Sequence, residues 1–259
     1  MARGTGGGVK PVLVAFAVLA FYGLFYRYVV ARWGGVVEWA LRAFRLDTRR
    51  PVREVEAVGK LAAAGVAQLL FALALALWTG FPGDRIFGTH VDAGVWAAAA
   101  LLGAGELALT SLVCTTIVEV AVASGADARR WSARSRGGWM SLFLLTARAA
   151  PSTLTIASVC LYVTVEELIF RGILISEFAG WGGAAAVCVS AALFVAVQAF
   201  GMPNVPAALY PMVGALVIGV VHGVLFWLVP AVAPLALAHV AFFAAALTLA
   251  APRTAPGLR

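Results

Sequence analysis

Two adjacent carboxylates and an arginine lie inside an apolar stretch of the chain, VTVEELIFRGILISEF, from Val163 to Phe178. Ionisable side chains near the middle of a bilayer cost at least about 2.5–3.5 kcal/mol each on insertion scales, so they indicate a functional site or a buried partner. Glu167 and Arg171 are four residues apart with the acid first, the order that favours an ion pair within a helix. Glu166 points about 100° away from this pair and has no partner close in sequence. This leaves Glu166 available as a general base.

The same three residues also fit a purely structural cluster of ion pairs that bridges helices, and their spacing does not choose between the two interpretations. Other costly polar residues fall in apolar segments: Glu106, Arg148, Gln198, His222 and His239. We expect Glu106 to be a structural partner of Arg148 or Arg171. Each of the two histidines, taken alone, is more typical of a hydrogen-bonded core residue than of a catalytic one.

The composition indicates the elements that position these residues. Of 259 residues, 63% are hydrophobic and 12% charged, about half of the ~25% charged residues of a soluble domain. Several apolar runs reach the roughly 18–20 residues that cross a bilayer. The sequence therefore predicts an all-α, polytopic membrane helix bundle with about seven spans. We place these spans near residues 11–26, 58–80, 94–123, 152–178, 184–200, 207–229 and 231–251, with a shorter half-helix at Trp139–Ala149.

The net charge of +7 comes largely from two segments between predicted spans, residues 27–60 and 127–136. Clusters of Lys and Arg beside spans are typical of cytoplasmic loops, so we expect the N-terminus outside and the C-terminus inside. Within the first segment, VVEWALRAFRL has the pattern of an amphipathic turn or two on the membrane surface. This clustering argues against a nucleic-acid partner. We expect an integral protein of a bacterial-type plasma (inner) membrane.

The sequence does not predict a metal or cofactor. The three cysteines, Cys114, Cys160 and Cys188, lie in apolar helices without the spacing of metal ligands. The acids and histidines are also too scattered for a zinc site. We therefore expect a catalytic water and no metal.

Four motifs in order resemble the CAAX protease and bacteriocin-processing (CPBP, or Abi) family of intramembrane endopeptidases. EELIFRG is similar to its first signature, E-E-x-x-x-R-G, and SAALFVAVQ is similar to the helix with F-x-x-x-H. GVVHGVLFW is similar to a glycine-spaced helix, and LALAHVAFF to the last signature, H-x-x-x-N. The resemblance covers about Glu166 to Phe243. It implies a division within one bundle into N-terminal membrane helices with basic loops (1–138) and a CPBP-like core (139–259).

The resemblance also implies roles for the site residues. Glu166 would activate a water for attack on a peptide bond, and His239 would stabilise the oxyanion. Gln198 stands where the family has its first histidine, and Phe243 stands where it has the asparagine. Glutamine cannot take a proton, and a general acid–base partner is worth about 10²–10⁴ in rate. A lost oxyanion donor costs about 10²–10³. Gln198 itself, or His222 turned inward, could substitute.

We expect the catalytic residues to be Glu166, Glu167, Arg171, Gln198 and His239, with His222, Phe243 and Glu106 as accessory residues. The first hypothesis is an intramembrane endopeptidase that processes a membrane-associated or C-terminal peptide segment, with a membrane protein or peptide as substrate. The second, motivated by Gln198 and Phe243, is a pseudoprotease that binds a membrane protein without cutting it. A small transporter ranks last, because nothing indicates a solute and no internal repeat is evident.

Overall fold

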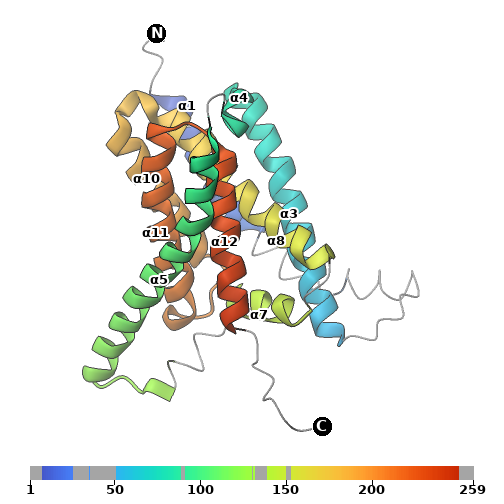
Figure 1. Ribbon diagram of the computed structural model, residues 1–259, viewed down its shortest axis with the longest axis vertical. Helices are drawn as coiled ribbons and strands as arrows, with labels where there is room; N and C mark the ends of the chain where they lie inside the picture. The colour runs from blue at the N-terminus through green and yellow to red at the C-terminus, as the bar shows by residue number, and fades with distance from the viewer. Residues whose placement is uncertain are drawn as a thin grey trace.

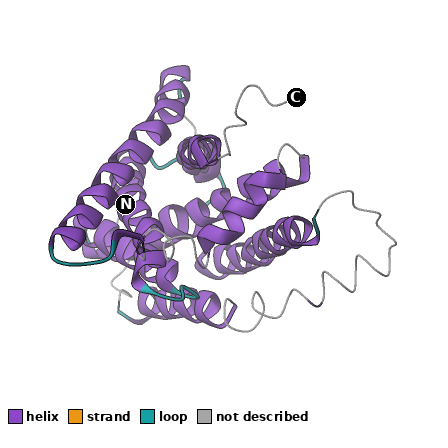
Figure 2. Ribbon diagram, turned by 90° about the horizontal axis from the view of Figure 1, so that it is seen from below, coloured by secondary structure: helices purple, strands orange, loops and turns teal. Residues whose placement is uncertain are grey.

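Helices account for the regular structure in the computed structural model of the chain, which describes residues 8–25, 35, 51–88, 91–129, 131, 139–149 and 153–250. No strand occurs among these residues, as Figures 1 and 2 show. The longer helices are α1 (Val9–Leu24), α3 (Val52–Thr79), α5 (Ala93–Ala123), α7 (Trp139–Ala149), α8 (Thr153–Glu167), α10 (Gly183–Ala199), α11 (Val205–Leu228) and α12 (Val232–Ala250). The shorter elements are α4 (Asp84–Phe87), η2 (Leu168–Leu174), α9 (Ile175–Phe178) and η3 (Ala179–Trp181).

Four helices are long and apolar enough to cross a membrane: Arg53–Thr79, Ala93–Ala123, Thr153–Trp181 and Val205–Leu228. Three shorter apolar helices accompany them, Val9–Leu24, Gly183–Ala199 and Val232–Ala246. The prediction of an all-α membrane helix bundle is confirmed. The predicted half-helix at Trp139–Ala149 is also helical, and Figure 1 shows it lying across the lower end of the bundle.

Glycines allow the helices to pack closely around the charged residues. α5 packs against α12, and α10 packs against α11. A Cβ on Gly103 of α5 would lie 2.2 Å from the carbonyl oxygen of Ala238 in α12. On α11, Gly219 faces Ala191 and Gly223 faces Val187. Small residues at such contacts let helix backbones approach closely, which is how helices associate in a membrane.

The described helix ends next to the two basic segments of the sequence lie at the same end of the bundle. Figure 1 shows the start of α3, the end of α5 and helix α7 at the lower end, with α4 and the start of α1 at the upper end. Most of both segments, including VVEWALRAFRL, lies outside the described residues. The orientation of the bundle in the membrane stays a prediction. The division at residue 138 also stays a prediction. Helix α5, which precedes residue 138, packs on α11 and α12, which follow it, so the two parts belong to one bundle.

Candidate active site

A π-helical segment directly follows the two glutamates. Leu168–Leu174 form this wider helix between α8 and α9, and π segments within α-helices occur frequently at functional sites. The Ser190 hydroxyl of α10 donates a hydrogen bond of 2.6 Å to the carbonyl oxygen of Phe170. This bond attaches the π segment to α10. Glu166 and Glu167, at the end of α8, are both buried in the bundle.

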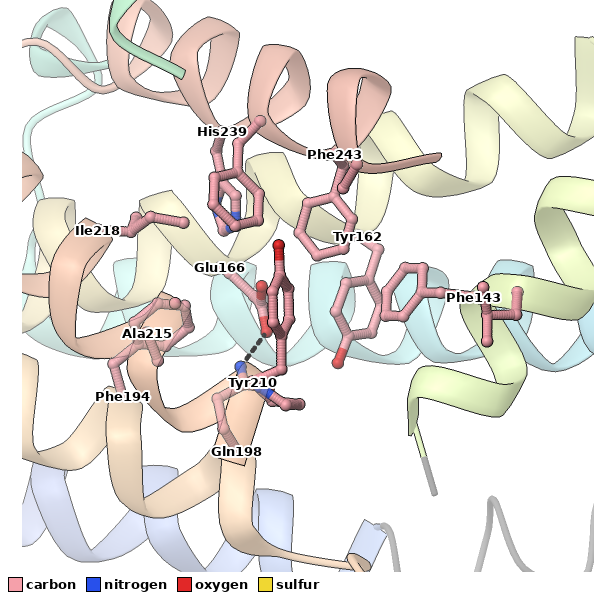
Figure 3. Close-up of a pocket in the computed structure, with 15 residues that line it drawn as sticks. Phe143, Tyr162, Glu166, Phe194, Gln198, Tyr210, Ala215, Ile218, His239 and Phe243 are labelled. Carbon is pink, nitrogen blue, oxygen red and sulfur yellow. Dashed lines mark hydrogen bonds between the residues drawn. The ribbon is translucent and has the colours of Figure 1, made fainter. Parts of the chain in front are cut away.

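Glu166 lines a cavity between α7, α8, α10, α11 and α12. Figure 3 shows its carboxylate facing the cavity between His239 above and Gln198 below. The Gln198 amide Nε2 donates to Glu166 Oε1 over 3.3 Å, and Tyr162 lines the same cavity. The cavity has a volume of about 80 Å³, counted as the space that the centres of water-sized molecules can occupy. One water needs roughly 10–15 Å³ by this measure. A catalytic water therefore fits beside Glu166.

Most of the cavity wall is apolar and aromatic. Its lining residues are Phe143, Leu144, Tyr162, Glu166, Phe194, Gln198, Tyr210, Pro211, Gly214, Ala215, Ile218, His239, Phe242, Phe243 and Ala246. Phe243 packs at a tilt against His239, with ring centroids 5.3 Å apart, and against Phe143, with centroids 4.8 Å apart. The position of the family asparagine is thus filled by an aromatic ring that has no hydrogen-bond donor.

Glu167 lies behind the cavity and binds three basic side chains. Its Oε1 is 2.7 Å from His239 Nδ1, and its Oε2 is 3.0 Å from His222 Nδ1. Arg171 Nε is 3.3 Å from the same Oε2, so the predicted ion pair is present. The Arg171 guanidinium also lies over the Phe194 ring, 4.3 Å from its centroid. Glu167 therefore orients a cavity-lining histidine and is itself fixed by two further groups.

Glu106 pairs with a different residue from those that we expected. Its Oε1 is 3.1 Å from His222 Nε2, whereas we predicted a pair with Arg148 or Arg171. The Arg148 side chain lies outside the described residues, and Arg171 is engaged by Glu167. His222 is buried and makes one hydrogen bond, from Nδ1 to Glu167 Oε2, as expected for a core histidine, and its Nε2 lies at ion-pair distance from Glu106 Oε1 without hydrogen-bond geometry. The sequence could not show which of Arg148, Arg171 and His222 pairs with Glu106, since these three residues lie on α7, η2 and α11.

The structure divides the predicted site residues into two layers. Glu166, Gln198, His239 and Phe243 line the cavity, whereas Glu167, Arg171, His222 and Glu106 form a buried network behind it. His222 does not line the cavity as a substitute base. Tyr162 was missed, although it is four residues before Glu166 and hence on the same face of α8.

The cavity-lining groups suit hydrolytic chemistry. A carboxylate, an imidazole and an amide face a shared space large enough for water, which is the set of groups that general acid–base catalysis uses. Within the described residues, no group of three or more His, Cys, Asp or Glu side chains is arranged to hold a metal ion. The expectation that a catalytic water suffices stays a prediction.

Comparison with known families gives one match. Residues 148–245 match the model of the type II CAAX prenyl endopeptidase Rce1-like family. The resemblance inferred from the four motifs is thereby confirmed, and it supports a function of the CAAX-type intramembrane protease kind. With the four apolar spans, the match indicates an integral membrane protein, and the matching family is one of peptide hydrolases. No curated protein and no solved structure matches the chain.

Proposed function

We propose that this protein is an intramembrane endopeptidase of the glutamic type, which hydrolyses a peptide bond in a membrane-associated or C-terminal peptide segment. The observation that carries the proposal is the position of Glu166 and His239 on one water-sized cavity inside the bundle. Glu166 takes a proton from a water in this cavity, and the hydroxide attacks the carbonyl carbon of the substrate. The protonated Glu166 then donates to the leaving amine nitrogen as the carbon–nitrogen bond breaks.

Gln198 acts as a positioning group and an oxyanion donor in this proposal. One hydrogen of its amide is directed at Glu166 Oε1. A side-chain amide carries two hydrogens, so the second is available for the developing oxyanion of the substrate. An oxyanion donor is worth about 10²–10³ in rate. This role compensates in part for Phe243, which donates nothing.

The apolar wall favours a substrate with large apolar side chains or an attached lipid. Six aromatic residues line the cavity: Phe143, Tyr162, Phe194, Tyr210, Phe242 and Phe243. A membrane protein or peptide that reaches the cavity from the bilayer is the substrate that such a wall accommodates. We place the protein in a bacterial-type plasma membrane, with the lipid bilayer as its other partner and without nucleic acid.

The test is cleavage by the purified full-length protein in liposomes. The probes are peptides with a farnesylated C-terminal cysteine motif, the same peptides without the farnesyl group, and apolar transmembrane peptides. Products are identified by mass spectrometry in H₂¹⁸O, where hydrolysis labels the new carboxyl group. Glu166→Gln should lower the rate at least ~10²-fold. The matched control is Glu119→Gln, which changes an exposed acid on α5. Cleavage that survives Glu166→Gln would overturn the mechanism.

A second function, a pseudoprotease that binds a membrane partner, is favoured by one observation. Phe243 packs on both His239 and Phe143, so an apolar contact replaces an oxyanion donor in the cavity wall. The double substitution Gln198→His with Phe243→Asn distinguishes the two functions. A pseudoprotease should gain cleavage of the same probe peptides only in the double variant. Hydrolysis by the unmodified protein would exclude this second function.

A further inference from the structure

Four side chains form a continuous chain of alternating acids and imidazoles that ends at the cavity. Glu106 Oε1 is 3.1 Å from His222 Nε2, and His222 Nδ1 is 3.0 Å from Glu167 Oε2. Glu167 Oε1 is 2.7 Å from His239 Nδ1. All four side chains are at most 3% exposed. Glu106 belongs to α5, outside the segment that matches the family model, residues 148–245.

The position of His222 between two carboxylates stabilises its imidazolium form. His222 Nδ1 is hydrogen-bonded to Glu167 Oε2, and His222 Nε2 lies 3.1 Å from Glu106 Oε1 without hydrogen-bond geometry. A neutral imidazole has one donor and one acceptor nitrogen, whereas an imidazolium carries a proton on both and places its positive charge between the two ionised acids. In that state, the charges of Glu106 and Glu167 are balanced by His222 and Arg171. Charge balance matters here because an uncompensated buried charge is strongly destabilising.

Glu167 links the protonation of His222 and Arg171 to the tautomer of His239. With His222 and Arg171 both at Oε2, Glu167 is ionised, and its Oε1 accepts a hydrogen bond from the Nδ1–H group of His239. A neutral imidazole that donates from Nδ1 carries its lone pair on Nε2, at the opposite side of the ring. His239 lines the cavity. It therefore presents a proton acceptor to a water there rather than an oxyanion donor.

We propose that Glu106 is a positioning residue of the active site, which holds His222 as an imidazolium. This cation acts together with Arg171 to keep Glu167 ionised and His239 in the Nδ1–H tautomer. This inference deepens the proposed hydrolase function and rests on it for its catalytic consequence. The proton arrangement itself does not depend on any substrate. The two can therefore be tested separately.

The test is ¹⁵N NMR of the full-length protein labelled at histidine and held in lipid nanodiscs. The chain contains three histidines, and the variants His90→Gln and His239→Gln assign their signals. Imidazole nitrogen shifts distinguish protonated from unprotonated nitrogens. We expect two protonated nitrogens on His222, and on His239 one protonated Nδ1 and an unprotonated Nε2. A single protonated nitrogen on His222 in the unmodified protein would overturn the proposal.

Substitutions at Glu106 provide the second readout. Glu106→Gln removes the charge but keeps the side-chain length, so His222 should change from two protonated nitrogens to one. Glu106→Asp keeps the charge and should retain both. Glu119→Gln, the same change on an exposed face of α5, should leave all signals in place. An unchanged His222 in Glu106→Gln would contradict the proposal.

The catalytic consequence is measured with the cleavage assay. Glu106→Gln should lower kcat more than it changes KM, because Glu106 does not line the cavity, and Glu106→Asp should recover part of the loss. If no probe peptide is cleaved by any form of the protein, the hydrolase proposal fails while the NMR result still decides the proton arrangement. A wild-type kcat in Glu106→Gln would refute the positioning role.

Discussion

Glu166 and Glu167 are neighbours in the sequence but have different partners. Glu166 faces the cavity and accepts from the Gln198 amide, whereas Glu167 is bound by His222, His239 and Arg171. Successive residues of a helix point about 100° apart, so one pair of acids reaches two separate environments. One acid is thus available to a water and the other is fully occupied by protein groups.

This difference predicts that substitutions of the two acids change the free energy of unfolding by different amounts. Glu167→Gln leaves Arg171 and His222 without their shared counter-charge in the bundle interior. Breaking a buried ion pair in this way costs about 3–5 kcal/mol. Glu166→Gln keeps the side-chain shape and changes a cavity-facing group, so its free energy of unfolding should stay within about 1 kcal/mol of the unmodified protein. The measurement is denaturant-induced unfolding in mixed micelles, and equal stability of the two variants would contradict this assignment.

The sequence predicted the residues of the site better than their pairing. The spacing of Glu167 and Arg171 predicted their ion pair, and the motif order predicted that Glu166, Gln198 and His239 would share a site. The partner of Glu106 could not be predicted, because it is more than a hundred residues away in the chain. The sequence did contain one indication that Glu106 faces the interior. Gly103, Glu106 and Thr110 repeat at helical spacing, and all three are buried in α5.

At the scale of elements, the π segment depends on a contact from another helix. The Ser190 hydroxyl of α10 donates to the Phe170 carbonyl. Ser190→Ala should remove this bond and leave a buried carbonyl oxygen without it, at a cost of about 1–3 kcal/mol. The control is Ser158→Ala, because the Ser158 hydroxyl bonds only to Leu154 of its own helix. Unfolding in micelles measures the stability of both variants. An equal loss of stability would show that the hydrogen bond between α10 and η2 contributes no more than a bond within one helix.

The contact between α5 and α12 predicts a sharp contrast between two glycines. A Cβ on Gly103 would meet the Ala238 carbonyl oxygen at 2.2 Å and the Phe242 amide nitrogen at 2.7 Å, whereas a Cβ on Gly105 meets nothing within 4 Å. Gly103→Ala should therefore lower stability by about 1–3 kcal/mol through overpacking.

Gly105→Ala is the matched control on the same helix and should stabilise by up to about 1 kcal/mol, because alanine favours helix. Since His239 lies next to Ala238, Gly103→Ala should also move the His239 imidazole signals in the NMR experiment. Equal stability of the two variants would contradict the close approach of α5 and α12.

Apolar runs predicted the helices because a bilayer requires long stretches without exposed backbone polar groups. The predicted spans near 94–123 and 207–229 are α5, Ala93–Ala123, and α11, Val205–Leu228. The π segment was not predicted, because LIFRGIL has the composition of an ordinary helix. Its geometry depends on packing and on the Ser190 contact, which no local pattern contains.

At the scale of the whole molecule, the arrangement of the helix ends predicts the orientation in the membrane. Ser124 follows α5 at the end flanked by the basic segments, and Gly180 lies in η3 at the other end. In a protein without its three cysteines, Ser124→Cys should react with a membrane-impermeant thiol reagent from the cytoplasmic side and Gly180→Cys from the outside. Both sites are exposed. The reverse labelling would mean that the positive-inside assignment is wrong.

The buried chain from Glu106 to His239 has a consequence for biogenesis. A ribosome makes the chain from its N-terminus, so α5 enters the translocon before α8, α11 and α12 exist. Until those helices arrive, Glu106 is a solitary acid in lipid, at a cost of about 2.5–3.5 kcal/mol. Helix α12 brings His239, so the bundle should reach its final arrangement only after α12 has been inserted, and chains truncated before α12 should be preferred targets of membrane quality control.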